Sequence, residues 1–445
     1  MKNDLWTRRQ FAASMALAAG ALSMPGLLTN RAATPDPAPQ PSRPRKKVAI
    51  IATAMKKFYH AEHFMDRVGD GYGWQGAWHQ PPLEPAGLYI DQFPDGELSR
   101  AWAQRHGSTI YPSVAEALTL GGSKLAVDGV LVVGEHGEYP RDANGRRIYP
   151  KFKWHKEIVK VFEASGRSVP VFQDKHLSTE WREAVEMVED SRRLGFAFMA
   201  GSALPVTWRI PALEFPVGSK LTESVAVGYG GLDSYDFHCL EMAQCMSERR
   251  AGGEVGVKMI EAARGERAWD ILARRETTRE LMFAALARSH TLAALPGYTS
   301  IVPDFDWLRL RGPNIAAFFI EHLDGFKTTV LMLNGRFEGA FQRDRVEVND
   351  FTYAGRLHSG KIAACKVHLP FPPYWTTLAD FFSPLVNHFE NMVLTGRAPY
   401  PIERTLLTTG MLNVGLESLA RGQPMATPEL AVAYQPPTES QFWRS

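Results

Sequence analysis

Short apolar runs alternate with longer amphipathic segments through the first half of the chain. Apolar runs that predict strands cover Val48–Ala52, Leu88–Ile90, Val127–Val133, Val169–Phe172 and Phe196–Ala200. Segments with a helical spacing of apolar positions cover Val114–Leu120, Trp154–Ala164 and Thr179–Leu194. Strands that alternate with helices of this length predict βαβ units and a doubly wound parallel sheet. We therefore predict an α/β fold whose first domain spans residues 46–211, with a second domain over residues 212–445.

The chain opens with a pattern typical of an export signal. Arg8 and Arg9 stand in the sequence TRRQF, an uncharged apolar run continues to about Leu28, and Ala32-Ala33 offers small residues for cleavage. Residues 1–33 are therefore predicted to be a twin-arginine signal, with the twin-arginine translocation machinery as a partner and a periplasmic or other extracytoplasmic location. The alternative is that the apolar run is not cleaved off and anchors the protein in the membrane. Residues 34–45 are rich in proline and predict an extended linker.

Polar side chains follow several of the predicted strands. Asp91 follows the strand Leu88–Ile90, Glu135-His136 follows Val127–Val133, and Asp174-Lys175-His176 follows Val169–Phe172. In open parallel sheets, ligands bind at the carboxyl ends of the strands. These residues are therefore candidates for one site, and Trp208-Arg209, after the last strand, are candidates for a place at its entrance.

A metal site is an alternative use of the same edge. If the strands Val48–Ala52, Val127–Val133 and Val169–Phe172 are neighbours, then His60, His136 and His176 approach one another. Imidazole with carboxylate suits zinc, iron or manganese. However, the sequence from His60 to His63 is HAEH, which is not the His-Glu-x-x-His motif of zinc peptidases. We therefore predict no metal and keep these three histidines as the alternative.

Composition excludes some classes of protein. The formal net charge is +2 over 445 residues, so nothing indicates nucleic acid as a partner. The three cysteines, Cys239, Cys245 and Cys365, form no spacing for a metal or a disulfide framework. The glycine- and tryptophan-rich segment from Asp66 to Pro85 predicts either a lid or a contact surface for another subunit, and not a regular helix.

The whole pattern resembles the family of glucose-fructose oxidoreductase, inositol dehydrogenase and the rhizopine-catabolism proteins. The residues that carry this resemblance are Asp174-Lys175-His176, the segment GYGGLDSYDFHCLEM around His238, the alternating strand from Ala316 that is followed by Thr328–Leu333, and the carboxyl-terminal segment TGRAPYPIERTLLTTGMLNVGLESLARGQPMATPEL. The resemblance implies a Rossmann-like dinucleotide-binding domain followed by an α+β domain with a large, mostly antiparallel sheet. It also implies a homo-oligomer that pairs through an open face of that sheet.

The resemblance implies roles for individual residues. Lys175 and His238 match the catalytic lysine and histidine of the family. The residues that match the cofactor-binding positions are Ala52, Thr53, Ala54, Asp91, Glu135, Asp174 and Lys175. Those near the substrate are Trp208, Arg209 and Tyr235. The implied cofactor is NAD or NADP.

The chain departs from the family at the first turn. Dinucleotide-binding domains carry Gly-x-Gly-x-x-Gly there, because bare backbone lets the pyrophosphate approach the amino end of a helix. Here the turn reads Ala52-Thr53-Ala54-Met55-Lys56-Lys57, without glycine. Each missing glycine places a Cβ near the phosphate position, and only Lys56 and Lys57 offer a compensating charge.

Two functions remain open from the sequence. One is an exported oxidoreductase-like enzyme that acts on a carbohydrate or polyol hydroxyl with a nicotinamide cofactor, including a redox-neutral cycle that cleaves glycosides. The alternative is a relative that has lost the dinucleotide and acts as a binding protein or as a metal-assisted sugar-processing enzyme. Lys175, His238 and Asp91 favour the first, and the turn without glycine favours the second.

Overall fold

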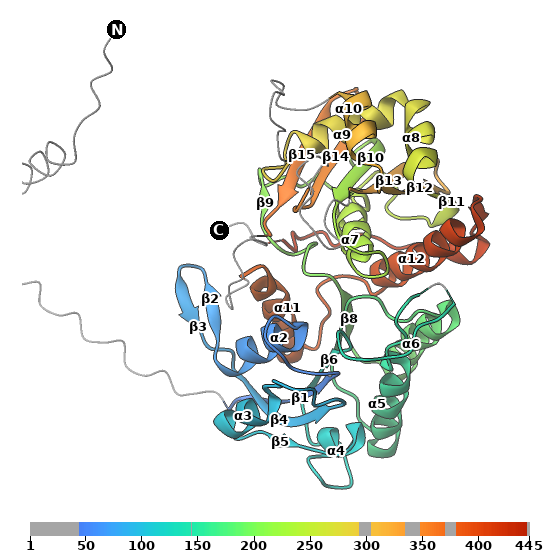
Figure 1. The fold of residues 1–445 in the computed structure, drawn as a ribbon. Coiled ribbons are helices and arrows are strands. Elements are labelled where there is room, and N and C mark those ends of the chain that lie inside the picture. Colours follow the sequence, from blue (N-terminus) through green and yellow to red (C-terminus); the bar gives the residue numbers. More distant parts are fainter. Residues whose placement is uncertain (1–43, 144, 293–303, 334–347, 370–379, 443–445) are drawn as a thin grey trace, which may run out of the picture. The chain divides into compact units, whose positions relative to one another are not determined.

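The structure is a computed structural model that describes residues 44–143, 145–292, 304–333, 348–369 and 380–442. The predicted twin-arginine signal and nearly all of the predicted linker lie outside these residues. Within them, a six-stranded parallel sheet is followed by an eight-stranded, mostly antiparallel sheet (Figure 1). The predicted fold class is confirmed. No helix of the described residues is long and apolar enough to cross a membrane.

The first sheet has the strand order β5-β4-β1-β6-β7-β8, with every pairing parallel. Its strands are β1 (Lys46–Ala52), β4 (Leu83–Ile90), β5 (Thr109–Ile110), β6 (Gly129–Val133), β7 (Val171–Asp174) and β8 (Phe198–Gly201). This order, which reverses direction beside the first strand, is that of doubly wound dinucleotide-binding sheets.

Helices cover both faces of this sheet. They are α2 (His60–Gly69), α3 (Ser99–His106), α4 (Val114–Thr119), α5 (Lys151–Ser165) and α6 (Trp181–Leu194). In β1, Val48, Ile50 and Ala52 join the core on the side of α2 and α3, whereas Ala49 and Ile51 join the core on the side of α4, α5 and α6. Burial on both faces explains why the sequence of this strand is apolar throughout rather than alternating.

The second sheet has the order β16-β11-β12-β13-β10-β14-β15-β9. Its strands are β9 (Arg209–Ile210), β10 (Leu221–Gly228), β11 (Val257–Arg264), β12 (Ala316–His322), β13 (Lys327–Met332), β14 (Thr352–Leu357), β15 (Ile362–Val367) and β16 (Met425–Ala426). Only the β10–β13 pairing is parallel. Strand β9 shows that the second sheet begins at Arg209, three residues before the predicted boundary at residue 212.

Helices also pack on the second sheet. These are α7 (Tyr235–Ser247), α8 (Gly265–Ala273), α9 (Glu276–Leu286), α10 (Phe305–Arg311) and α12 (Glu403–Arg421). Residues of α8, α9 and α10 share a core with one face of the sheet, which includes Val225, Phe319 and Leu331. Along these strands the face is therefore covered rather than open, unlike the pairing face that the resemblance implies.

Two carboxyl-terminal helices tie the two sheets into one core. Helix α11 (Ser383–Thr395) packs against α2, and α12 packs against both α7 and α6. Phe64 of α2, Phe237 of α7 and Phe389 of α11 belong to the same buried cluster. The site between the sheets is therefore built on a continuous hydrophobic core.

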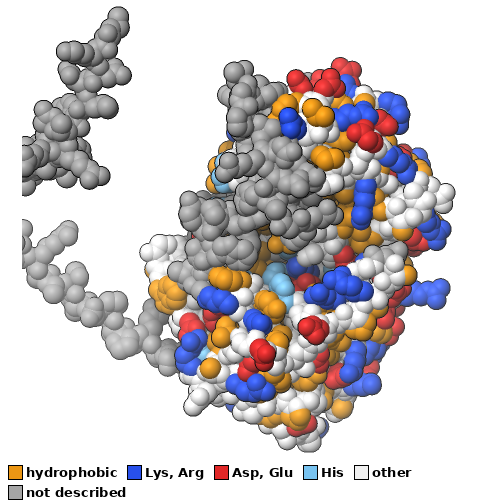
Figure 2. Space-filling view, viewed as in Figure 1, with side chains coloured by type: hydrophobic (Ala, Val, Ile, Leu, Met, Phe, Trp, Pro, Cys, Tyr) orange, Lys and Arg blue, Asp and Glu red, His pale blue; other side chains and the backbone are white. Residues whose placement is uncertain are grey.

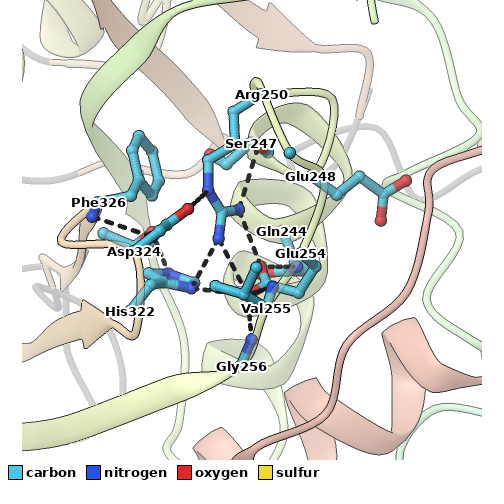
Figure 3. A network of polar contacts seen from close by, with 12 residues as sticks. Gln244, Ser247, Glu248, Arg250, Glu254, Val255, Gly256, His322, Asp324 and Phe326 are labelled. Carbon is cyan, nitrogen blue, oxygen red and sulfur yellow. Dashed lines mark hydrogen bonds and ion pairs between the residues drawn. The ribbon is translucent and has the colours of Figure 1, made fainter. Parts of the chain in front are cut away.

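A buried polar network lies beside the second sheet, at the end of α7 (Figure 3). The Arg250 guanidinium donates two hydrogen bonds to the carboxylate of Glu254, at 2.9 and 3.0 Å, and a third to Asp324 at 2.7 Å. His322, which is fully buried, lies 3.1 Å from Glu254 through its Nδ1. The network joins the loop after α7 to the turn between β12 and β13.

The segment predicted as a lid or contact surface contains a β-hairpin. Strands β2 (Tyr72–Trp74) and β3 (Ala77–His79) pair antiparallel, and Tyr72 and His79 both contact the Glu390 carboxylate of α11. The prediction that the segment forms no regular helix holds beyond Gly69, where α2 ends. Strand β5, helix α3 and this hairpin were not predicted from the sequence.

Candidate active site

Strands β1, β6 and β7 are neighbours, as the sequence predicts, and their carboxyl ends form the base of the site. The Thr53 hydroxyl, after β1, donates to the backbone oxygen of Glu135, after β6, at 2.5 Å. His136 and Lys175 both adopt left-handed backbone conformations, with φ of 69° and 62°. Non-glycine residues rarely adopt this conformation, and such residues cluster at functional sites.

Lys175 is a buried cation at this edge. Its Nζ lies 3.2 Å from the Glu135 carboxylate and donates to the Ser234 hydroxyl at 3.2 Å. Burial opposes the charge, but Glu135 and Asp174 outweigh it and hold the pKa of Lys175 above its usual value. Lys175 therefore carries a positive charge at neutral pH.

Glu135 is the counter-ion of two lysines. Its carboxylate lies 2.8 Å from Nζ of Lys151, which is 1% exposed, and 3.2 Å from Nζ of Lys175. Burial alone would favour the neutral acid, but Lys151 and Lys175 hold the pKa of Glu135 well below its usual value. The ammonium groups of Lys151 and Lys175 are therefore balanced at the base of the site by the carboxylates of Glu135 and Asp174.

Two histidines are oriented by short hydrogen bonds to other side chains. Nδ1 of His60, at the start of α2, lies 2.6 Å from Oδ2 of Asp174. Nδ1 of His238, in the first turn of α7, lies 2.6 Å from the Ser202 hydroxyl. The His60 and His238 rings lie 6.3 Å apart between centroids. Each ring therefore has its Nδ1 fixed by the protein, while Nε2 of neither ring bonds to another of the described residues.

Two further imidazoles complete the group. His136 stacks on Tyr59 at 4.4 Å, and His63 stacks on Phe382 at 4.7 Å. Burial, together with His60 and Lys175, lowers the pKa of His136 to about 3, and burial with Arg67 lowers that of His63 to about 2. Both rings are neutral at ordinary pH. Nε2 of His136 and Nδ1 of His63 are buried without a hydrogen-bond partner among the described residues.

These side chains surround one cavity of about 120 Å³, which holds several water-sized molecules. Its polar lining is formed by His60, His63, His136, Lys175, Ser202, Tyr229, Ser234, Tyr235 and His238. Its apolar lining is formed by Phe58, Ala203, Leu204, Phe351, Leu369, Phe381 and Phe382. Figure 2 shows histidine surface in pale blue near the junction of the two halves of the molecule, beside basic side chains. A polar ligand held here is largely surrounded by aromatic rings.

Not all predicted site residues meet in this cavity. Lys175, His238 and Tyr235 line it, as does His60. Trp208 packs edge-on against His368, and Arg209 is buried, donating to the backbone oxygens of Pro205 and Leu213. Neither Trp208 nor Arg209 lines the cavity.

His176 also lies outside the cavity. It is fully buried, packs edge-on against Phe237, and burial with the nearby Lys151 lowers its pKa well below the usual value. Of the three histidines considered for a metal, the structure brings only His60 and His136 together, 5.3 Å apart between centroids. Among the described residues, no group of three or more histidine, cysteine, aspartate or glutamate side chains is arranged to hold a metal ion.

The residues at the dinucleotide position do not fit a pyrophosphate. Ala52, Thr53 and Ala54 are fully buried, and the Thr53 amide donates to Val133. The Glu62 carboxylate accepts the amide of Phe58 and the Lys57 ammonium, so an anion of the protein lies at the amino end of α2. A phosphate in that place would meet both this charge and the Cβ atoms of the turn.

The predicted ribose contact is likewise engaged within the protein. Oδ1 of Asp91 accepts from Tyr89 at 2.6 Å and Oδ2 accepts from Tyr139 at 2.7 Å. Asp91 does lie at the end of β4, where a ribose-binding carboxylate is expected. Both of its oxygens are already bonded to phenol groups, so a ribose would have to displace at least one tyrosine.

Several residues of the cavity were not singled out from the sequence. Ser202 directly follows β8, so the rule that ligands bind at the carboxyl ends of parallel strands could have identified it. Phe382 precedes α11, more than 300 residues after His63, and nothing in the local sequence places it beside that ring. Phe351 lies immediately before β14, and nothing in the local sequence places it in the cavity.

Comparisons with known proteins bear on the fold. No family model matches the chain. No curated protein matches it either. The solved structure of GenD2 from gentamicin A biosynthesis, in complex with NAD, is similar with a TM-score of 0.50 and 12% identity, over 88% of this chain and 99% of that chain.

Two other similar structures are dehydrogenases of inositols. A myo-inositol dehydrogenase from Corynebacterium glutamicum gives a TM-score of 0.50 at 12% identity, over 86% of this chain and 98% of that one. A scyllo-inositol dehydrogenase from Lactobacillus casei gives 0.51 at 11% identity, over 86% and 98%. The chain therefore has the two-domain fold of the inositol and sugar dehydrogenases that the sequence resembles.

Proposed function

We propose that this chain is an enzyme that acts at a hydroxyl-bearing carbon of a small carbohydrate or polyol by proton transfer. The observation that carries the proposal is the convergence of the Lys175 ammonium and the His238 imidazole on one cavity. A buried ammonium stabilises negative charge that develops on a substrate oxygen, and this effect is strongest where water is excluded. The imidazole moves a proton to or from the same region.

The other groups of the cavity support a ligand with several hydroxyls. Ser234 and Tyr235 line the cavity and offer hydroxyl groups within the same turn of chain as His238. The aromatic rings of Phe351 and Phe382 offer apolar faces, against which the C–H groups of a sugar pack. This mixture of a few polar groups in an apolar wall is typical of small-molecule sites.

An oxidoreductase that uses NAD or NADP is the second candidate. It is favoured by the position of Lys175 after β7, which matches the catalytic lysine implied by the resemblance. In that case Lys175 and His238 would orient the hydroxyl and accept its proton, and the nicotinamide would supply hydride chemistry. The turn after β1 and the Glu62 carboxylate do not fit its pyrophosphate, so we place this function second and derive no step through the cofactor.

Turnover of a panel of sugars and polyols, measured with and without NAD and NADP, tests the proposal. We expect turnover without a dinucleotide, and a loss of about 10²-fold or more in Lys175→Met. Lys153→Met, at an exposed position of α5, is the matched control and should retain full activity. Unchanged activity in Lys175→Met would refute the assignment, and turnover only with added or copurified dinucleotide would favour the second candidate.

Export and assembly are proposed on the sequence alone. Arg8 and Arg9 support export by the twin-arginine route, and replacing both with lysine should retain the protein in the cytoplasm. Fractionation of cells that express the two forms would decide this. A homo-oligomer is proposed from the family resemblance, and light scattering of the purified protein measures it.

A further inference from the structure

The cavity holds a second oriented imidazole that the proposed function does not use. We infer that His60, oriented by Asp174, is the base of this site and that His238, oriented by Ser202, is its acid. The inference rests on the proposed function, since it assigns proton-transfer roles within the same cavity. It further assigns the substrate class, which is a reducing sugar with a hydroxyl next to its carbonyl group.

The Asp174 carboxylate fixes the proton of His60. An ionised carboxylate only accepts hydrogen bonds, so the Nδ1 of His60 that lies 2.6 Å from Oδ2 carries a proton. Asp174 is 1% exposed and the His60 side chain is 15% exposed, so the pair is shielded from water while the ring still reaches the cavity. The lone pair of His60 is therefore on Nε2, as a base requires.

We assign the opposite tautomer to His238. The Ser202 hydroxyl oxygen accepts the Leu204 amide at 3.1 Å and lies 2.6 Å from Nδ1 of His238, and we assign the hydroxyl as the donor of that second hydrogen bond. A ring that accepts at Nδ1 carries its proton on Nε2. His238 therefore presents an N–H to the cavity.

The two rings are positioned as a pair. Their centroids are 6.3 Å apart with an interplanar angle of 26°, and both line the cavity together with Lys175. Burial, Lys175 and His60 hold the pKa of His238 well below its usual value, so the ring remains a neutral N–H donor. A neutral imidazole, kept neutral by a lowered pKa of its protonated form, can donate its N–H to a developing oxyanion.

This arrangement matches a proton shift between the carbonyl carbon and its neighbour. His60 takes the proton from the carbon next to the carbonyl, the C–H electrons form a C=C bond, and the carbonyl π electrons move to oxygen. The Lys175 ammonium stabilises that oxyanion, and His238 protonates it to an enediol. His238 then takes the proton from the neighbouring hydroxyl, and His60 returns its proton to the former carbonyl carbon. Both rings are restored and no oxidant or reductant is consumed.

Histidine tautomers can be read without a substrate. In the full chain labelled with ¹⁵N-histidine, two-bond ¹H–¹⁵N spectra distinguish Nδ1–H from Nε2–H, and His60→Asn and His238→Asn assign the two rings by loss of their signals. We expect Nδ1–H in His60 and Nε2–H in His238. The same tautomer in both rings, or Nε2–H in His60, would overturn the inference.

Deuterium uptake from D₂O by D-glucose, D-mannose and D-fructose tests the reaction. His60→Asn keeps an amide N–H near the position of Nδ1, and so can still donate to Asp174, but it has no base at Nε2. We expect its exchange at C1 or C2 to fall about 10²- to 10⁴-fold. His358→Asn, at an exposed position after β14, is the matched control and should exchange at the rate of the unaltered chain.

The two experiments separate the inference from the proposed function. Turnover that is lost in Lys175→Met but retained in His60→Asn would overturn the role of His60 and leave the proposed function standing. The expected tautomers without deuterium uptake from any of the three sugars would overturn the enediol reaction. The expected tautomers with uptake that depends on both His60 and Lys175 would support both.

Discussion

The Glu62 carboxylate accepts the backbone N–H of Phe58 at the amino end of helix α2 and lies 2.8 Å from the Lys57 ammonium. A negative charge at this end stabilises a helix through its dipole. In dinucleotide-binding domains the same end receives the pyrophosphate. Here a side chain of the protein is the anion, which explains how the turn after β1 can lack glycine and still join a stable helix.

We therefore expect that NAD and NADP do not stabilise this protein. A ligand that binds only the folded state raises the free energy of unfolding, by about 2.7 kcal/mol at 100 times its dissociation constant, and therefore raises the melting temperature. We expect no shift in the melting temperature at millimolar NAD or NADP. GenD2, whose solved structure contains NAD, is the positive control. A shift of several degrees with either nucleotide would contradict this interpretation of Glu62.

The layout of the first domain could be predicted because its strands are buried on both faces. Such strands are continuous apolar runs, and the chain marks their ends with charged residues, as at Glu135 and Lys175. The predicted neighbourhood of the strands Val48–Ala52, Val127–Val133 and Val169–Phe172 then follows from the usual winding of parallel sheets. For this reason His60, His136 and Lys175 could be brought to one edge before the structure was known.

The partners of these residues could not be predicted in the same way. Ser234, four residues before His238, bonds to Lys175, whereas the partner of His238 is Ser202 from the other domain. That exchange depends on how α7 packs against β8, a relation between distant segments. Phe382 enters the cavity for the same reason, through the packing of α11 on α2.

Glu241 should give the protein a measurable pH dependence of stability. It is fully buried between α7 and α12 and accepts from the Thr408 hydroxyl at 2.5 Å. Burial raises its pKa from 4.5 to about 7 in the folded protein, so the folded state holds a proton that the unfolded state has already lost. Stability therefore falls as pH rises from about 4.5 to about 7, by up to about 1.4 kcal/mol per pH unit from this group, and levels off above.

Glu241→Gln tests this assignment, because the amide has nearly the same shape and does not titrate. Urea unfolding at a series of pH values should give a flatter profile for the variant between pH 4.5 and 7 than for the unaltered protein. Asp236, whose pKa burial raises to about 7, and Asp66 and Asp233, whose pKa values burial raises to about 6, remain in both proteins and contribute to the residual slope. Parallel profiles would show that Glu241 does not hold the proton.

Arg250 should be among the most sensitive positions for stability outside the cavity. Its guanidinium bonds both oxygens of Glu254, a carboxylate with no exposed side-chain surface, and also bonds Asp324. Removal of one partner of a buried ion pair leaves the other charge without compensation, and we expect Arg250→Met to lower the free energy of unfolding by about 3–5 kcal/mol. Lys258→Met is the matched control, because its pair with Glu321 is exposed at the lysine and should contribute less than about 1 kcal/mol.

The double variant Arg250→Met with Glu254→Gln separates the loss of packing from the unpaired charge. If the charge is the main cost, the second change removes it, and the double variant should be more stable than Arg250→Met alone. The remaining groups that bond to that side chain are Gln244, Val255, Gly256 and His322. Part of the destabilisation should therefore persist, because an amide presents only one oxygen to them. Urea unfolding of the three variants and the unaltered protein measures each step. A double variant less stable than Arg250→Met would have the opposite meaning. The hydrogen bonds from the N–H groups around Glu254 to its negative charge would then stabilise the fold by more than the unpaired charge destabilises it.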